Sequence, residues 1–132
     1  MNKLMLSVAA MLLFASGYAV GQRQPPAQNT GYRDELLRSI GLEGEFSSTS
    51  GRILRMRKIT LQPGGMLSLH DHNDRPAVTY LLEGEVTYWQ DGRPDRVLRT
   101  GEGMAEGRGP RHWAENTGKV PAVWIGVDIP KQ

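Results

Sequence analysis

Histidine is scarce in this sequence, and its placement points to metal chemistry. The chain of 132 residues contains three histidines, His70, His72 and His112. Alternate residues of an extended strand point to the same face, so His70 and His72 would direct two imidazoles to one side. Three neutral imidazoles converging from two strands can bind a divalent metal and leave coordination positions open. The competing interpretation is an ordinary polar pair, His70 and His72, that faces water.

The segments around these histidines resemble the two sequence motifs of the cupin family. The first motif is Gly, five residues, His-x-His, four residues, Glu, six residues and Gly, and the chain matches it at Gly64, His70, His72, Ala77 and Gly84. The second is Gly, five residues, Pro-x-Gly, two residues, His, three residues and Asn, and the chain matches it at Gly101, Gly107, Gly109, His112 and Asn116. Every spacing is kept over about residues 52–129, but Ala77 replaces a Glu and Gly107 replaces a Pro.

The resemblance implies an all-β fold, a small double-stranded β-helix or jelly-roll barrel with a metal inside one end. It also implies that His70, His72 and His112 are the metal ligands, whereas the metal could be iron, manganese, nickel or zinc. Ala77 stands where the family places a fourth ligand, a Glu. Three histidines alone would leave the charge of the ion uncompensated, which makes the ion a stronger Lewis acid and favours an anionic ligand.

Nearby charged residues offer substitutes for the missing Glu. Asp74 follows His72, and Glu106 precedes the turn before His112. Either carboxylate could complete the site, although a surface position is the competing interpretation of both. Arg75 and Arg111 could likewise attract an anion to the mouth of the barrel or could simply be solvated.

The elements that must position these residues are mostly short strands. From Arg52 onward, apolar and polar residues alternate between Gly- and Pro-rich turns, a pattern that predicts about eight strands in an antiparallel sandwich or barrel. The parity of the strand that begins at Ala77 places Thr79 and Leu81 inside and Tyr80 outside. Before the strands, apolar residues in segment 32–40 recur at helical spacing and predict one short amphipathic helix that ends at Gly41.

The N-terminus has the pattern of a secretory signal peptide. Lys3 precedes an uncharged apolar run, and Ala19-Val20-Gly21 offers small residues for cleavage. We therefore expect residues 1–21 to be a signal peptide and not a retained membrane anchor, since the run is short for a spanning helix. Residues 22–31 are then a flexible leader and residues 32–132 a single cupin domain. We expect a periplasmic or secreted bacterial protein, and because the chain has no cysteine, no disulfide stabilises it.

Composition narrows the function without naming it. The net charge of +2 is spread along the chain, so we expect no nucleic-acid partner. Two hypotheses remain open: a metal-dependent enzyme of the dioxygenase type that acts on a small anionic molecule, and a non-catalytic module that binds a small molecule or metal. No general base or nucleophile stands out, so no catalytic residue is assigned. The resemblance also implies a homodimer, with the two-sided strand at residues 52–60 as one candidate interface.

Overall fold

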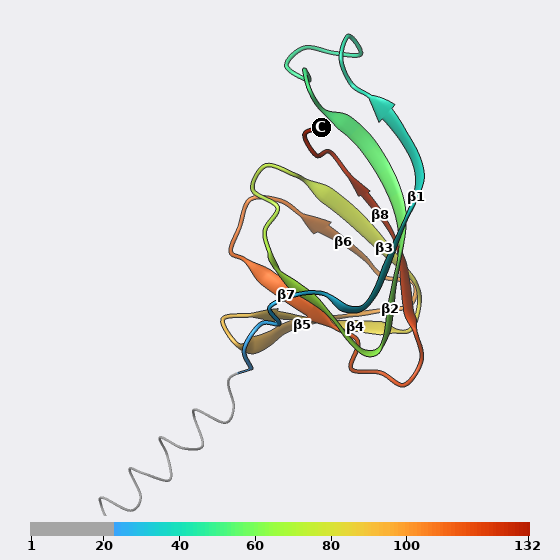
Figure 1. Cartoon of the computed structure of the whole chain (residues 1–132), viewed down its shortest axis with the longest axis vertical. Coiled ribbons are helices and arrows are strands. Elements are labelled where there is room, and N and C mark those ends of the chain that lie inside the picture. Colours follow the sequence, from blue (N-terminus) through green and yellow to red (C-terminus); the bar gives the residue numbers. More distant parts are fainter. Residues whose placement is uncertain (1–22) are drawn as a thin grey trace, which may run out of the picture.

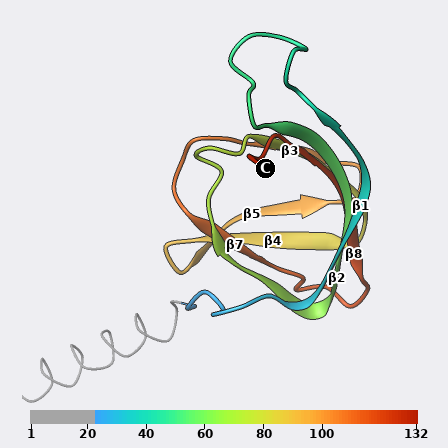
Figure 2. The same ribbon diagram turned by 45° about the horizontal axis from the view of Figure 1, so that its top comes forward.

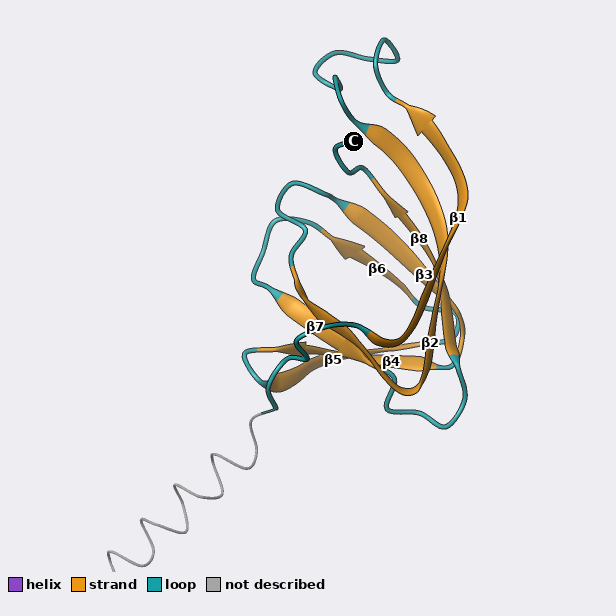
Figure 3. Cartoon of the chain, in the orientation of Figure 1, coloured by secondary structure: helices purple, strands orange, loops and turns teal. Residues whose placement is uncertain are grey.

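The described part of the chain consists of strands and loops. The computed structural model describes residues 23–132, so the expected signal peptide lies outside the described residues. The strands are β1 (Thr30–Gly41), β2 (Ile53–His70), β3 (Ala77–Glu83), β4 (Glu85–Gln90), β5 (Arg93–Arg99), β6 (Gly103–Glu106), β7 (His112–Glu115) and β8 (Ala122–Asp128). Figure 3 shows no helix within this region, and hence none there that could span a membrane. The predicted all-β fold is confirmed.

The strands form one antiparallel sheet that curls into a nearly closed barrel (Figures 1 and 2). The strand order is β5-β4-β7-β2-β8-β3-β6, and β1 pairs with β2. The first part of β2 pairs with β8, between residues 55 and 61, and its last part pairs with β7, between residues 66 and 70. β2 therefore belongs to both walls of the barrel, one with β8 and β3 and the other with β7 and β4. Its C-terminal end brings His70 to the place where these walls face each other.

A glycine pair bends β2 between the two walls. The Pro- and Gly-rich stretch at residues 63–65 has the composition of a turn between two strands, but β2 continues through it. Gly64 has a φ of 72°, a conformation that favours glycine. A Cβ on Gly65 would lie 2.8 Å from the carbonyl oxygen of Gln62 and 2.9 Å from that of Thr30, too close for any side chain. The glycines therefore let one long strand redirect the chain toward the histidines.

The predicted helix over residues 32–40 is wrong, because this segment is part of β1. Its residues pair with the first half of β2 from Tyr32 opposite Leu61 to Gly41 opposite Ile53. A register shift between Leu36 and Arg38 breaks the alternation of the strand and leaves apolar residues at helix-like spacing. Pairing supplies backbone hydrogen bonds along an edge of β2 that would otherwise be open, and this tertiary gain outweighs the local helical pattern.

Apolar side chains fill the barrel between its walls. The core contains Ile59, Leu61, Leu81, Val86, Tyr88, Leu98, Ala114, Ala122 and Trp124. The parity predicted for β3 is confirmed, because Thr79 and Leu81 are buried whereas Tyr80 is 51% exposed. Four members of this core, Ile59, Tyr88, Ala114 and Trp124, also border a cavity inside the barrel.

The two walls differ on their outer faces. The wall built from β2, β8 and β3 exposes large apolar side chains outward, a surface that we call the outer apolar face; it comprises Leu54, Met56, Val78, Tyr80 and Leu82.

On the other wall, Trp89 and Trp113 are buried and stack with ring centroids 5.0 Å apart. Arg23, from the leader, lies over Trp89 and forms an ion pair with Glu115. The leader thus covers one wall, whereas the outer apolar face remains exposed.

Candidate metal centre

Three strand ends bring the histidines together. His70 ends β2 and lies opposite His112, which begins β7, as a directly paired residue. His72 follows in the loop after β2, and its side chain is buried. Glu106 ends β6 and lies directly opposite Ala77 on β3. We call these four residues, His70, His72, Glu106 and His112, the histidine–glutamate cluster.

The ligand atoms of the cluster converge closely enough to share one ion. One nitrogen of each histidine and one carboxylate oxygen of Glu106 all lie within 4.8 Å of one another. The Glu106 Oε1 atom is 3.2 Å from His112 Nε2 and 3.6 Å from His72 Nε2. In octahedral coordination, ligand atoms at about 2.1 Å from the ion lie about 3.0 Å apart when they are adjacent and about 4.2 Å apart when they are opposite. The observed spacing is close to that of a coordination shell.

Backbone contacts orient the imidazoles for metal binding. His70 Nδ1 lies 2.8 Å from the carbonyl oxygen of Ser68, and His72 Nδ1 lies 3.1 Å from that of Arg75. A carbonyl oxygen only accepts, so each Nδ1 carries the proton and each Nε2 keeps its lone pair. The Nε2 atoms of His72 and His112 are buried without a hydrogen-bond partner among the described residues. Buried nitrogens of this kind suit a cation.

Electrostatics keep the cluster in the protonation state that a metal requires. Burial lowers the pKa of His70 to about 4, and burial likewise lowers the pKa of His72. Burial alone would raise the pKa of Glu106, but the close approach of His112 and the other two histidines outweighs it and lowers that pKa. At neutral pH His70 and His72 are therefore uncharged and Glu106 is ionised, and both kinds of group are good ligands for iron, manganese, nickel or zinc.

Of the two carboxylates considered from the sequence, only Glu106 reaches the cluster. Its side chain is 8% exposed. Asp74 is 61% exposed and forms ion pairs with Arg52 and Lys131 on the surface. Glu106 on β6 is the direct cross-strand partner of Ala77 on β3, the position where the family has its Glu. Its carboxylate therefore reaches the cluster from the strand next to the one that carries the Glu in the family motif.

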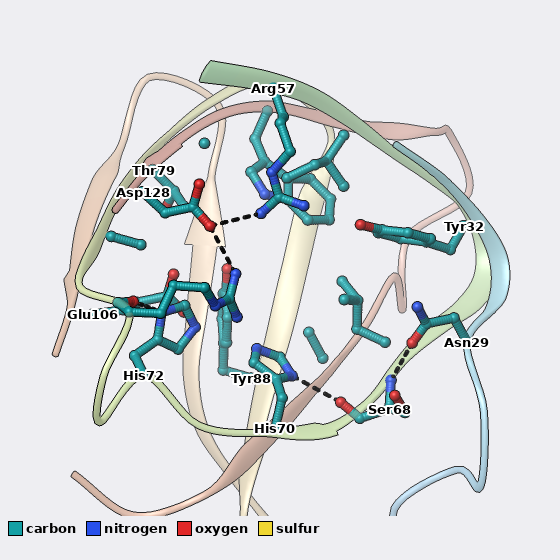
Figure 4. A pocket seen from close by; sticks show the side chains of 17 residues that line it. Asn29, Tyr32, Arg57, Ser68, His70, His72, Thr79, Tyr88, Glu106 and Asp128 are labelled. Carbon is teal, nitrogen blue, oxygen red and sulfur yellow. Dashed lines mark hydrogen bonds and ion pairs between the residues drawn. The ribbon is translucent and has the colours of Figure 1, made fainter. Parts of the chain in front are cut away.

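A polar cavity of about 240 Å³ opens in front of the cluster (Figure 4). Tyr88 forms part of its floor and meets the His112 ring edge-on, with centroids 5.7 Å apart. Burial strongly raises the pKa of Tyr88, so its hydroxyl stays protonated. The remaining lining includes residues that the sequence alone did not single out, namely Asn29, Tyr32, Arg57, Ser68 and Asp128.

The other residues considered from the sequence have mixed roles. Arg75 lines the cavity and donates to Asp128, so it is not merely solvated. Arg111 lies outside the cavity and donates to the carbonyl oxygen of Leu69. Between the two histidines of the first motif, Asp71 accepts a hydrogen bond from the backbone of Asn73 and belongs to a loop turn.

Asn116 is fully buried and its side chain binds the backbone of Leu61, Gly118 and Val120. It therefore holds the turn after β7.

Fold and cluster together define a small single-barrel protein with a metal-binding arrangement at its open end. The family model described as "Cupin domain" matches residues 57–129, more than half of the chain. The chain therefore belongs to the cupin family, as its motifs indicated.

Several solved structures share this fold. KdgF from Halomonas sp. has a TM-score of 0.59 at 14% identity, with 83% of this chain and 88% of that chain covered. A predicted oxalate decarboxylase from Thermotoga maritima has a TM-score of 0.55 at 21% identity, with 82% and 96% covered. An oxalate oxidase in complex with glycolate has a TM-score of 0.53 at 21% identity, with 76% and 55% covered. At these identities the likeness concerns the fold alone, and no curated protein matches the sequence.

Proposed function

We propose that this cupin is a metal-dependent enzyme of the bacterial periplasm that acts on a small anionic organic molecule with chemistry of the dioxygenase type. The convergence of the histidine–glutamate cluster within 4.8 Å is the observation that carries the proposal. The apolar run and small-residue site before Gln22 support export. Oxalate oxidase shares the fold, and its substrate is a small anion of the proposed kind.

The residues of the cluster would hold the ion, and the cavity would hold the substrate beside it. A bound iron or manganese ion supplies Lewis acidity and redox capacity. The carbonyl groups behind His70 and His72 fix the direction of their rings, and the Glu106 carboxylate offsets one charge of the ion. The protonated hydroxyl of Tyr88, on the cavity floor, can donate a hydrogen bond to a bound anion.

A non-catalytic binding module is the second candidate, and one observation favours it. The charged side chains of the cavity outside the cluster are already engaged in ion pairs, namely Arg57 with Asp34 and Asp128, and Arg75 with Asp128. None of these groups is placed as a free general base. A module of this kind would bind the same metal and anion without turnover.

Metal content tests the site, and oxygen consumption separates the two candidates. The mature protein, purified from the periplasm, should contain about one first-row metal ion per chain, and His72→Ala should lose it. Asp74→Ala is the matched control, because it alters a carboxylate near the loop but outside the cluster. Oxygen uptake with a panel of small oxo acids, diols and thiols supports the enzyme, whereas metal binding without uptake supports the module. Absence of metal from the wild-type protein would refute the enzyme and the metal-binding form of the module.

A further inference from the structure

A buried carboxylate organises three arginines beside the metal-binding cluster. Asp128 is 1% exposed and accepts from Arg55 at 3.0 and 2.8 Å, from Arg57 at 3.2 Å and from Arg75 at 2.8 Å. Arg57 also pairs with Asp34 on β1. Figure 4 shows Arg57 reaching into the cavity from the wall opposite His70, with Asp128 beside it. Asp128 therefore holds the guanidinium groups of Arg57 and Arg75 in fixed positions in the cavity that the cluster borders.

Two of these arginines retain donors for a ligand. Arg57 Nε is buried and has no hydrogen-bond partner among residues 23–132. The Arg75 side chain donates from Nη1 to Asp128, and it is 30% exposed at the cavity. A guanidinium presents its N–H groups in a planar fork that matches a carboxylate, which gives it an advantage over a lysine in this role.

The charges around the cavity define the ligand further. Two guanidinium groups, those of Arg57 and Arg75, and two carboxylates, those of Asp128 and Glu106, line the cavity. Histidines that bind a metal are uncharged, so this set is neutral and a divalent ion brings it to +2. A buried excess of positive charge is costly unless an anion compensates it. A ligand with two negative charges would restore neutrality.

The size of the cavity sets an upper limit on that ligand. The cavity measures about 240 Å³, below the range of roughly 300–1,000 Å³ that is typical of drug-sized ligands. At about 30 Å³ per water molecule, it is equivalent to roughly eight waters. A short organic acid fits this space, whereas a nucleotide is too large for it.

We propose that Arg57 and Arg75 form a carboxylate-binding subsite, and that the ligand of this cupin is a short dicarboxylate or a comparable dianion that reaches from the metal to these arginines. The inference rests on the proposed function, because the bound ion supplies the charge that the anion offsets. Asp128 acts as a positioning residue, since it holds the arginines and does not need to contact the ligand.

Binding of malonate to the zinc-loaded protein tests the subsite without turnover, because zinc has no redox chemistry. We expect calorimetry to detect malonate binding, to detect no binding of the uncharged analogue malonamide, and to show at least tenfold weaker malonate binding in the metal-free protein. Arg75→Gln, which keeps a donor toward Asp128, should weaken malonate binding by about tenfold or more, as expected for a lost charge-assisted hydrogen bond. Its zinc affinity should stay within about twofold of the wild type.

Control variants separate the subsite from general effects. Arg33→Gln removes a charge from β1 at a side chain that is 79% exposed, and it should leave malonate affinity unchanged. Arg75→Lys keeps the charge but loses the planar fork, so its malonate affinity should lie between that of the wild type and that of Arg75→Gln. If Arg75→Gln melts at a lower temperature, Arg75→Lys provides the test in its place. Equal malonate affinity in wild type and Arg75 variants, with normal zinc binding, overturns the subsite alone. Failure of the wild type to bind zinc overturns the metal site and the subsite with it.

Discussion

The replacement Glu106→Gln gives the sharpest test of the metal centre, because its cost to stability should be small without metal and large with it. The side chain is 8% exposed, and its carboxylate lies among three imidazoles. In the metal-free protein a buried carboxylate carries a desolvation cost that an amide of the same shape avoids. The contacts with the histidines that lower the pKa of Glu106 outweigh this cost, so we expect metal-free Glu106→Gln to be slightly less stable than the wild type near neutral pH.

With metal present the same change should be costly. Loss of an outer hydrogen-bond partner of a metal ligand lowers affinity about 10- to 100-fold, so loss of a direct, charged ligand should reach at least about 100-fold, or ~2.7 kcal/mol. At a zinc concentration of about 1,000 times the wild-type Kd, zinc stabilises the wild type by about 4.1 kcal/mol and the variant by about 1.4 kcal/mol. For a domain of this size the difference corresponds to roughly 10 °C in Tm.

Thermal unfolding with and without zinc, together with a chelator competition titration, measures both effects. The double variant Ala77→Glu/Glu106→Ala is the matched control, since the two residues are direct cross-strand partners and the exchange moves the carboxylate from β6 to β3. It should recover most of the zinc affinity. If Glu106→Gln binds zinc within a few-fold of the wild type, or gains the same Tm from zinc, then Glu106 is not a ligand and the reasoning is refuted.

Three further predictions concern other parts of the barrel. Burial would raise the pKa of Asp128, but its arginine partners outweigh burial and lower that pKa. The ionised carboxylate therefore stabilises the fold at neutral pH, and this contribution should be lost as pH falls below about 4. In urea denaturation, the free energy of unfolding of Asp128→Asn should fall less steeply with decreasing pH than that of the wild type. Arg23→Ala removes the half-exposed pair with Glu115 and should cost about 1 kcal/mol, measured as a Tm lowered by roughly 4 °C. We also propose a homodimer through the outer apolar face. Light scattering of the wild type should give twice the chain mass, and Tyr80→Glu should give the mass of a monomer. A monomeric wild type would contradict the proposed dimer.

The positions of the histidines could be predicted because they depend on spacing within two short motifs. Alternation along a strand places His70 and Thr79 on definite faces, and the structure brings the three histidines together as the motifs implied. The assignment of β1 could not be predicted in the same way. Its state depends on the open edge of β2, which lies about twenty residues further along the chain, and local apolar spacing contains no information about that edge.

The arginines of the cavity illustrate a second limit. Arg57 lies in a strand with apolar and basic residues on both faces, so its parity alone does not separate an inward guanidinium from a solvated one. Its burial follows from Asp128, which comes 71 residues later and lies on the neighbouring strand β8. Only the register of β2 against β8 puts the carboxylate within reach, and sequence patterns do not specify that register.

A metal site in a barrel can keep its carboxylate ligand when position 77 is Ala, because a residue at the matching position of the neighbouring strand can reach the same ion. Cross-strand partners on one face have Cβ atoms about 4.5–5.5 Å apart, so a long side chain on either strand can reach the same point. The small side chain of Ala77 leaves room for Glu106 to cross toward the histidines. A bulky apolar residue in that space should displace the carboxylate, and Ala77→Leu should therefore lower zinc affinity about as much as Glu106→Gln does. Zinc binding by Ala77→Leu at wild-type strength would show that Glu106 does not need this space.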